Sequence, residues 1–558
     1  MTTKSIPLSY AHTGSKKEFI FKNIGEVVKY TAEKYPDHDA LVAIWRNETY
    51  TYKEFYKECC KAAKGFIKMG VNPGDRVAIW ATNYPEWVIT QVATAMVGAI
   101  LVPVNPAFRE HELEYTLKDS QAETLILIEK FKTSDYINML YNVCPETKTG
   151  GTIKSEPLPY VKNIIVLSEN EHPGMTTWNT FVESGTGIKD SKLEKRAQLL
   201  DPDDIINIQY TSGTTGFPKG ASLTHFNIVN NAYFVGENMK FTENDRLCIP
   251  VPFYHCFGMV LSTMVCMVFG AAMILPGEYF DPLRTLQAVQ KEKCTALHGV
   301  PTMFITELDH PKFENFDLSS LRTGIMAGAP CPINVMKKVI NSMGADEITI
   351  AYGLTEASPV TNQTTVDDSL EKRVETVGPP LAHTEIKIIN PETGAVQPVG
   401  KLGELCCRGF QVMKGYWNNP EETAKTIDNH WLHTGDLATM DEHGYCKIVS
   451  RIKDMIIRGG ENIYPREIEE FLLTHPDIAD AYVVGVPDKK YGEEIAAWIK
   501  PKEDLTPEDI TEYCKGKISH QKIPKYIKFV DEFPMTVTGK VKKFKIREMA
   551  TKELGLKD

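Results

Sequence analysis

The chain has 558 residues, of which 42% are hydrophobic and 24% charged, an ordinary composition for a globular protein of about three or four domain-sized units. Its formal net charge of -11 argues against a nucleic-acid partner held by a general basic surface. Twelve cysteines show no C-x-x-C spacing, which favours free thiols in a reducing compartment over disulfides or a metal cage.

Neither end of the chain shows a targeting signal. The N-terminus lacks the apolar run of a secretory signal, and the early Glu18 weakens a mitochondrial transit peptide. The C-terminal Leu-Gly-Leu-Lys-Asp is not a peroxisomal address. We therefore expect a cytoplasmic protein, with the mitochondrial matrix left open. Peripheral membrane contact and the oligomeric state also stay open.

The first third of the chain alternates between strand-like and helical runs. Residues 20–70 have a helical period around a short strand at 50–52. Strands and helices are then expected in turn at 76–80, 86–97, 100–104, 110–118 and 124–128. This alternation favours βαβ units and a parallel sheet. Residues 145–200 are polar and rich in Gly, Pro and Thr, so we expect a connecting region there.

A predicted strand at 205–210 leads into the loop Thr-Ser-Gly-Thr-Thr-Gly-Phe-Pro-Lys-Gly at 211–220. Its hydroxyls and glycine amides can donate hydrogen bonds and Lys219 adds a positive charge, so the loop suits a polyphosphate. It is not a Walker loop, because no Gly-Lys-Ser/Thr closes it. A helical pattern over 223–239 predicts that the loop lies between a strand and a helix. The candidate ligand-binding residues are Thr211, Ser212, Gly213, Thr214, Thr215, Gly216, Phe217, Pro218 and Lys219.

Residues 256–275 are uncharged and long enough to cross a bilayer, but Gly258 and Gly270 interrupt them. We expect a loop, a buried helix over about 258–269 and a buried strand over about 271–275, and no transmembrane span. This strand belongs to a second alternating set. Its other strands are expected at 247–251, 295–298, 322–327 and 347–351.

Ligands of open parallel sheets collect at the carboxyl ends of the strands, and Tyr-Gly-Leu-Thr-Glu at 352–356 follows such an end. Tyr352 offers a flat face for a purine and Thr355 a hydroxyl for a phosphate. Glu356 offers a carboxylate for Mg²⁺, which binds proteins through one or two carboxylates together with substrate phosphates. The sequence therefore predicts a nucleotide site at this edge.

The pattern changes after residue 380. Short strands at 385–389, 403–408 and 445–449 indicate a small β unit, and Asp436 in His-Thr-Gly-Asp could accept hydrogen bonds from ribose hydroxyls. Residues 450–465 look like a domain boundary. Beyond them we expect a compact α+β unit, with elements at 466–474, 479–486, 494–500, 506–518 and 526–530.

These motifs, in this order from about residue 25 to 550, resemble the adenylate-forming superfamily of acyl-CoA synthetases, luciferases and peptide-synthetase adenylation modules. The stretches at 254–258, 457–465 and 517–526 are most similar to medium-chain acyl-CoA synthetases. The resemblance implies an α/β fold. A large N-terminal domain at 1–450 would hold two doubly wound parallel-sheet subdomains and a small β-barrel-like subdomain. A hinge at 451–455 and a small mobile α+β C-terminal domain at 456–558 would follow.

The resemblance also implies roles for single residues. Lys540, Thr355, Glu356 and His255 would be catalytic, with Glu356 holding the metal and His255 standing at the acyl pocket. Other positions would bind ligands or form the hinge: Gly328 and Ala329 between adenine and acyl group, Tyr352 at the purine, Asp436 and Arg451 at the ribose, Lys453 at the hinge, and Gly459 and Gly460 beside the pantetheine arm of CoA.

The implied reaction joins a fatty acid to CoA with ATP and Mg²⁺, through an acyl-adenylate and with release of pyrophosphate and AMP. A carboxylate attacking the α-phosphate brings two anions together, so a cation such as Lys540 is needed between them. Medium-chain acids are expected, but aromatic, short-chain and long-chain acids stay open. A luciferase-like oxygenase, an amino-acid adenylating module and a non-catalytic lipid-binding protein are the alternatives.

Overall fold

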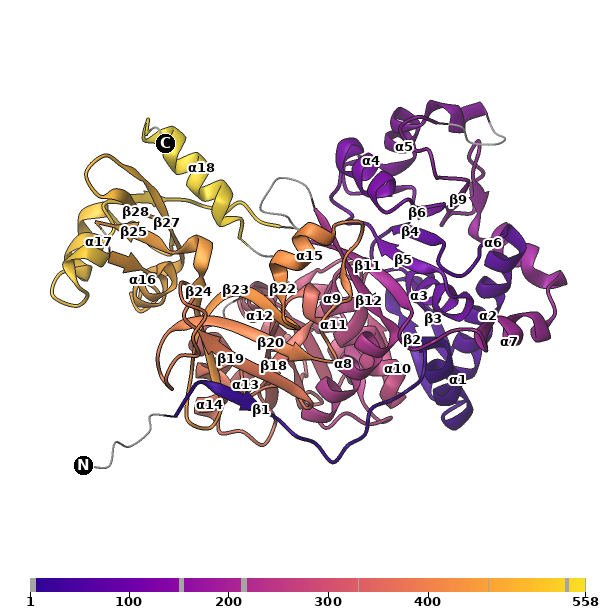
Figure 1. Cartoon of the computed structure of the whole chain (residues 1–558), viewed down its shortest axis with the longest axis horizontal. Helices are drawn as coiled ribbons and strands as arrows, with labels where there is room; N and C mark the ends of the chain where they lie inside the picture. The colour runs from indigo at the N-terminus through magenta and orange to yellow at the C-terminus, as the bar shows by residue number, and fades with distance from the viewer. Residues whose placement is uncertain are drawn as a thin grey trace. The chain divides into compact units, whose positions relative to one another are not determined.

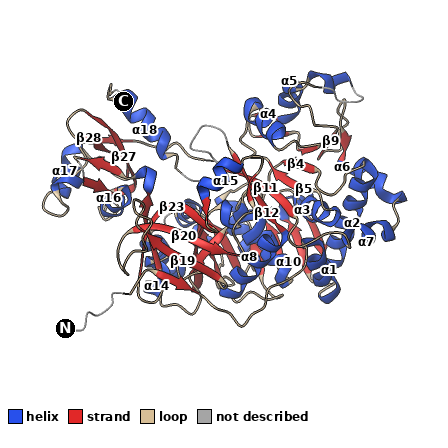
Figure 2. Ribbon diagram, viewed as in Figure 1, coloured by secondary structure: helices blue, strands red, loops and turns tan. Residues whose placement is uncertain are grey.

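The computed structural model describes residues 7–149, 155–211, 218–329, 331–459, 461–536 and 541–556. The chain forms two compact units. One comprises His12–Glu385 and Cys407–Leu432, and the other Met1–Ala11, Ile386–Cys406 and His433–Asp558. Figure 1 labels the elements along the chain, and Figure 2 shows helices packed around the strands.

The first large sheet contains the strand that leads into the phosphate-loop motif. Its order is β10-β9-β6-β4-β5-β11-β12-β21, and the strands from β10 to β11 are parallel. Burial on both faces explains why β4 and β6 are continuous apolar runs. The bounds are β4 Arg76–Trp80, β5 Ile100–Pro103, β6 Thr124–Leu127, β9 Asn163–Val166, β10 Thr176–Thr177, β11 Ile205–Thr211, β12 Lys219–Thr224 and β21 Gly415–Tyr416.

The second large sheet has the order β18-β17-β16-β15-β13-β14-β2-β3, parallel from β17 to β2 with an antiparallel strand at each edge. The bounds are β2 Asp39–Ala43, β3 Glu48–Thr51, β13 Arg246–Cys248, β14 Ala272–Leu275, β15 Ala296–Gly299, β16 Thr323–Ala327, β17 Glu347–Gly353 and β18 Val360–Gln363. One hydrophobic core contains Ile79 and Leu125 of the first sheet with Leu247 and Met273 of the second. The two predicted parallel sheets are confirmed.

Helices connect the strands of both sheets. Those that follow a strand directly include α3 Pro85–Val97 after β4, α4 Glu110–Asp119 after β5, α11 Pro282–Glu292 after β14, α12 Pro301–Leu308 after β15 and α13 Ile333–Met343 after β16. Two others fill the region before the first sheet, α1 Ile24–Lys34 and α2 Tyr52–Met69. The region at 145–200 is more than the expected connection, because it supplies β9 and β10 of the first sheet as well as two short helices, α6 Trp178–Ser184 and α7 Asp190–Ala197.

The prediction that the phosphate loop leads directly into a helix is wrong. Lys219–Thr224 is strand β12, antiparallel to β11 on one side and to β21 on the other. Helix α8 begins only at His225, where the side chains of Thr224 and Asn227 form a capping box. Six residues that pair with strands on both sides are too few to show a strand period. The loop at 212–217 therefore connects two antiparallel strands.

The uncharged segment folds as expected into the protein interior. Helix α9 Cys256–Gly258, a π-helical turn at Met259–Met264 and α10 Val265–Phe269 precede β14. Met259, Met264 and Val265 are buried in the core of the large sheets. Within the described ranges, no helix is both long and apolar enough to cross a membrane.

The predicted small β unit is a six-stranded sheet. Its order is β1-β19-β20-β23-β22, with β24 paired to β23. The ten-residue strand β23, which sequence reasoning missed, contains the His-Thr-Gly-Asp motif. The bounds are β1 Tyr10–His12, β19 Thr384–Ile389, β20 Gly403–Gly409, β22 Ile427–Asp428, β23 Trp431–Met440 and β24 Cys446–Arg451.

The predicted C-terminal α+β unit is a five-stranded sheet with order β26-β25-β28-β27 and β29 beside β28. Helices α16 Pro465–Leu472 and α17 Pro507–Cys514 bury Ile468 and Ile510 in one core. Near the C-terminus, helix α18 Lys543–Glu553 buries Ile546 and Ala550 beside Trp498. The strands are β25 Ile456–Arg458, β26 Glu461–Ile463, β27 Ile478–Asp488, β28 Gly492–Pro501 and β29 Tyr526–Phe529.

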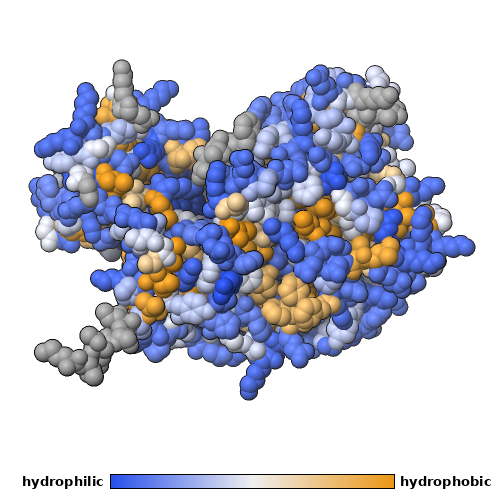
Figure 3. Space-filling view, viewed as in Figure 1, coloured by the Kyte–Doolittle hydropathy of each residue, from blue (hydrophilic) through white to orange (hydrophobic). Residues whose placement is uncertain are grey.

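All twelve cysteines are free thiols, as expected, and only Cys60 is not fully buried. The face of the molecule in Figure 3 is mostly hydrophilic, with hydrophobic residues scattered over it. Phe21 and Phe544 are among the exposed large hydrophobic side chains. Most apolar side chains instead lie in the cores described above.

Candidate active site

The phosphate-loop motif begins and ends on neighbouring positions of two strands. Thr211, the last residue of β11, pairs with Lys219, the first residue of β12. The Tyr115 hydroxyl donates a hydrogen bond to the Pro218 carbonyl at 3.1 Å, and the Tyr210 hydroxyl donates to Asp119 at 2.6 Å. Both contacts anchor the ends of the loop to α4. Ser212, Gly213, Thr214, Thr215, Gly216 and Phe217 lie outside the described residues.

Lys219 lies at a small cavity of about 190 Å³ beside this hairpin. Its ammonium group pairs with the Glu422 carboxylate of α15 Pro420–Thr426 and lies 5.4 Å from the ring centroid of Tyr416. Hydrogen bonds from Lys219 and then Lys425 lower the pKa of Glu422 to about 2. The lysine predicted to bind phosphate is therefore held by a carboxylate in this structure.

Glu356 also contacts Tyr416. The Tyr416 hydroxyl donates a hydrogen bond of 2.7 Å to Glu356 Oε1. Burial and the neighbouring Glu356 carboxylate raise the pKa of Tyr416. The Met413 amide donates to the Glu356 carbonyl at 2.9 Å, which ties the two segments through the backbone as well. Tyr416 thus contacts both the predicted phosphate lysine and the predicted metal carboxylate.

The turn that carries Glu356 follows directly from β17. Tyr352 and Gly353 are the last residues of this strand, and Thr355–Ala357 form a 3-10 turn. The Leu354 amide donates to the Pro359 carbonyl at 2.9 Å, which closes the turn against the strand that follows. The structure therefore places Tyr352, Thr355 and Glu356 together at the carboxyl end of a parallel strand.

The predicted acyl-side residues lie at the ends of other strands of the second sheet. His255 caps α9, where its Nδ1 accepts from the Phe257 amide at 3.1 Å. The Gln209 side-chain amide of β11 donates to the Tyr254 carbonyl. Gly328 follows β16 with a positive φ of 87°, a conformation that favours glycine, and Ala329 comes next.

A buried histidine in this region was missed from the sequence. His298 of β15 is fully buried, and its Nδ1 lies 3.1 Å from the Ser262 hydroxyl of the π-helical turn. Its ring lies 5.5 Å from that of Phe257, and its Nε2 has no hydrogen-bond partner among the described residues. Burial lowers the pKa of His298 to about 3, so the ring is neutral. A lone histidine in an apolar strand gives no signal in the sequence.

In the other unit, Asp436 and Arg451 pair across β23 and β24. Asp436 is only 8% exposed, and its Oδ1 lies 3.2 Å from Arg451 Nε. The preceding Gly435 has a φ of 70°, and its amide donates to Glu404 at 3.0 Å. Two residues predicted for the ribose are therefore adjacent, and a buried carboxylate holds the part of β23 immediately before Asp436.

The remaining predicted residues also belong to this unit. Lys453 is exposed in a 3-10 turn at Ile452–Asp454. Gly459 has a φ of 63°, and its amide donates to the Tyr491 carbonyl at 2.8 Å. Gly460 and Lys540 lie outside the described residues. Met535 and Val541, on the two sides of Lys540 in the chain, form an antiparallel bridge.

Comparison with known proteins identifies the family. Residues 28–417 match the model of the AMP-binding enzyme family, and residues 467–540 match that of the AMP-binding enzyme C-terminal domain. The chain is 53% identical over 536 residues to YngI of Bacillus subtilis (strain 168), a protein named for an expected acyl-CoA synthetase activity. That alignment covers 95% of this chain and 97% of YngI.

A zebrafish (Danio rerio) protein named medium-chain acyl-CoA ligase ACSF2, mitochondrial, is 46% identical over 559 residues, covering 99% of this chain and 92% of its own. Among solved structures, an anthranilate CoA ligase, AuaEII, in complex with anthranoyl-AMP superposes with a TM-score of 0.84 at 25% identity, over 96% of this chain and 98% of its own. The adenylate-forming fold is thereby shown, and ATP and CoA are substrates of the family. The chain belongs to the AMP-binding enzyme family and is an acyl-CoA synthetase, an acid–thiol ligase.

Proposed function

We propose that this acyl-CoA synthetase activates a medium-chain fatty acid. The observation that carries the proposal is the uncharged segment at 256–275, whose Met259 and Met264 are buried in the hydrophobic core. An acid bound against this segment would meet apolar side chains, which suit an alkyl chain. The name of the zebrafish relative supports the same class of acid.

The ATP phosphates are proposed to bind at the β11–β12 hairpin. Lys219 would supply a positive charge, and the Thr211 hydroxyl a hydrogen bond. Glu356 fits a magnesium ligand, because among the described residues only Tyr416 hydrogen-bonds its carboxylate, through Oε1. Bound Mg²⁺ would neutralise charge on the phosphates as pyrophosphate leaves. Asp436 is proposed to accept hydrogen bonds from the ribose hydroxyls, with Arg451 beside it.

Lys540 is proposed to stabilise the first half-reaction. The acid carboxylate and the α-phosphate are both anionic, and a lysine between them lowers the cost of bringing them together. Removing one such charge typically costs about 10²- to 10³-fold in rate. We therefore expect Lys540→Ala to lose acyl-adenylate formation by about this factor, yet to form thioester from supplied acyl-adenylate and CoA.

Pyrophosphate exchange measures the first half-reaction of Lys540→Ala, and a single turnover with synthetic acyl-adenylate measures the second. Lys542→Ala is the control, since it removes a neighbouring lysine outside the proposed site. Exchange at the wild-type rate in Lys540→Ala would show that this residue has no role in adenylation.

An aromatic acid is the second candidate substrate. The Phe257 and His298 rings lie 5.5 Å apart beside the same segment, and the solved relative AuaEII holds anthranoyl-AMP. The unpartnered Nε2 of His298 would suit a polar ring substituent, whereas a plain alkyl chain offers it nothing.

AMP release across acids distinguishes the two candidates. The series runs from acetate through octanoate to palmitate and includes benzoate and anthranilate. Medium-chain specificity predicts the highest kcat/KM near octanoate, because each buried methylene adds about 0.8 kcal/mol until the pocket is full. A higher value for benzoate or anthranilate would support the aromatic candidate. Activity limited to acetate or to palmitate would reject both.

A further inference from the structure

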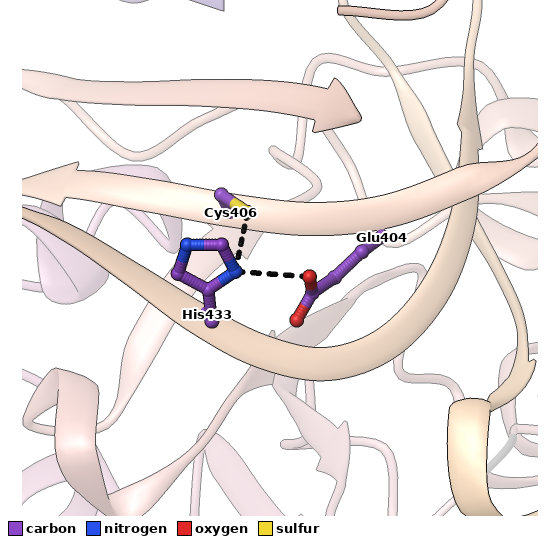
Figure 4. A group of neighbouring side chains, drawn as sticks. All are labelled: Glu404, Cys406 and His433. Carbon is purple, nitrogen blue, oxygen red and sulfur yellow. Dashed lines mark hydrogen bonds and ion pairs between the residues drawn. The ribbon is translucent and has the colours of Figure 1, made fainter. Parts of the chain in front are cut away.

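Three side chains of different chemistry meet beside the part of strand β23 that precedes Asp436. Glu404 and Cys406 are two positions apart on β20, so both point to the same face of the strand. His433 lies on the neighbouring strand β23 and faces them, as Figure 4 shows. We refer to Glu404, Cys406 and His433 as the β20–β23 cluster.

The donor atoms of this cluster are close enough to share one ion. His433 Nδ1 lies 2.9 Å from Glu404 Oε2 and 3.6 Å from Cys406 Sγ, and all three donor atoms lie within 4.8 Å of one another. Zinc holds nitrogen and oxygen ligands at about 2.0–2.2 Å and thiolate sulfur at about 2.3 Å, so ligand atoms of one ion are about 3–4 Å apart. The His433–Cys406 distance falls within this range, and the His433–Glu404 pair would have to move apart slightly.

We propose that the β20–β23 cluster binds a thiophilic divalent cation of the zinc class. A thiolate, an imidazole nitrogen and a carboxylate oxygen are all ligands that zinc accepts, and three protein ligands leave a fourth position for water. The ion would lie apart from the ATP–Mg²⁺ chemistry, since none of these three residues is among those proposed to hold phosphate or Mg²⁺.

Charge balance favours this assignment. Glu404 and Cys406 are buried, and His433 is partly buried. A dication with one thiolate, one carboxylate and one neutral imidazole has no net charge, which limits the cost of burial. Cys406 must bind as the thiolate, because the thiolate and not the thiol is the metal ligand. Binding therefore forms a metal–sulfur bond and releases the thiol proton to solvent, with no change of oxidation state.

The second carboxylate oxygen of Glu404 connects the proposed ion site to Gly435 of β23. Glu404 Oε1 accepts the Gly435 amide at 3.0 Å, whereas Oε2 faces His433. A cation on Oε2 can therefore replace the His433 hydrogen bond without breaking the Gly435 contact. The Thr434 hydroxyl also donates to the Leu405 carbonyl of β20 at 2.7 Å. A bound ion would thus tighten the segment immediately before Asp436.

Cobalt titration of the full-length protein tests the site, because Co²⁺ takes the same ligands as Zn²⁺ and its bond to thiolate gives a strong near-ultraviolet absorption. We expect one equivalent of Co²⁺ to produce this band, zinc to displace it, and about one proton to be released as it forms. Cys406→Ser should abolish the band. His433→Gln should keep sulfur ligation but weaken binding by at least the 10- to 100-fold that loss of an outer partner typically costs.

Cys407→Ser is the matched control, since Cys407 is the adjacent buried cysteine and points to the other face of β20. It should bind like the wild type. Circular dichroism shows whether each variant is folded. If Cys406→Ser does not fold, the cobalt affinity of His433→Gln tests the site instead. An unchanged cobalt band in folded Cys406→Ser, wild-type cobalt affinity in His433→Gln, or no thiolate band in the wild type would overturn the proposal.

Discussion

Glu422 forms an ion pair with Lys219, the lysine proposed to bind the ATP phosphates. The two groups form an ion pair with side chains only 25% and 16% exposed. The pKa of Glu422 is lowered to about 2, so the carboxylate stays charged and the competition persists throughout the neutral range. ATP must therefore displace this carboxylate from Lys219 or bind beside it.

Glu422→Gln should make the lysine easier to recruit. Partly exposed ion pairs are worth about 0.2–1 kcal/mol, so we expect the KM for ATP to fall by up to about fivefold. Because the pKa of Glu422 is far below the neutral range, the effect should be equal at about pH 6 and about pH 8. Initial rates at saturating acid and CoA measure it.

Glu421→Gln is the control for that substitution. It removes the same charge from the preceding, exposed residue of α15. A KM for ATP that rises in Glu422→Gln would mean that the carboxylate positions Lys219 instead of competing for it.

Glu307 in α12 is a buried carboxyl group that the proposed chemistry does not use. It is 1% exposed, and neither carboxyl oxygen has a hydrogen-bond partner within the described part of the chain. Burial raises the pKa of Glu307 well above 4.5. The folded protein therefore keeps this proton at pH values where the unfolded chain releases it.

Glu307→Gln should remove a pH-dependent loss of stability. At pH values between its unfolded and folded pKa, a buried carboxyl group lowers the free energy of unfolding by up to about 1.4 kcal/mol for each pH unit that the pH rises. Glutamine does not titrate, so the Tm of the variant relative to wild type should increase from about pH 5 to about pH 8. Scanning calorimetry measures this difference. The exposed Glu314→Gln is the control, and a constant difference across the range would contradict a raised pKa.

At the scale of elements, the turn after β17 depends on a glycine. A Cβ atom at Gly353 would lie 1.8 Å from the Pro359 carbonyl oxygen and 2.7 Å from its carbon, so the backbone of β18 would have to move. The same carbonyl accepts the Leu354 amide that closes the turn before Glu356. Close packing of two strands therefore determines where the proposed magnesium ligand lies.

Gly353→Ala should damage both stability and ATP use. Overpacking typically costs about 1–3 kcal/mol, and displacement of Glu356 should lower kcat/KM for ATP by about 10-fold or more. Thermal unfolding and pyrophosphate exchange measure the two effects. Gly187→Ala is the control, because nothing lies within 4 Å of its added Cβ. Pyrophosphate exchange at the wild-type rate in folded Gly353→Ala would show that catalysis does not depend on the geometry of this turn.

Most helices and strands could be predicted because their hydrophobic patterns can be recognised within a few residues of sequence. The buried strands β4 and β6, and the helix–strand order of 256–275, follow from patterns within a few residues. Strand β12 could not be predicted because its extended conformation depends on pairing with β11 and β21. Strand β21 lies about two hundred positions further along the chain. The contacts of Tyr416 with Lys219 and Glu356 could not be predicted either, because they too join residues far apart in the sequence.

At the scale of the whole molecule, the two half-reactions make opposite demands. The first needs a cation near the acid and the α-phosphate, the role proposed for Lys540, and the second needs a path for the CoA thiol to the acyl carbonyl. A single C-terminal domain cannot present both faces at once, so we propose that it turns about residues 451–455 between the steps.

Lys453→Pro should separate the two steps. Proline fixes φ near -65° and restricts the residue before it, so it should hinder rotation at this position. We expect pyrophosphate exchange to stay within about twofold of wild type while thioester formation falls by about 10²-fold. Lys453→Ala, which removes the charge but leaves the backbone free, is the control. Equal loss of both steps in Lys453→Pro would argue against alternation.

The burial of the cysteines has a practical consequence. Thiol reagents such as Ellman's reagent attack the thiolate, and eleven of the twelve cysteines are buried while burial raises the pKa of the remaining Cys60. The native enzyme should therefore add little background to a colorimetric assay that follows the disappearance of the CoA thiol. The same dye added after denaturation would titrate all twelve, which gives a direct measure of folded protein in any variant preparation.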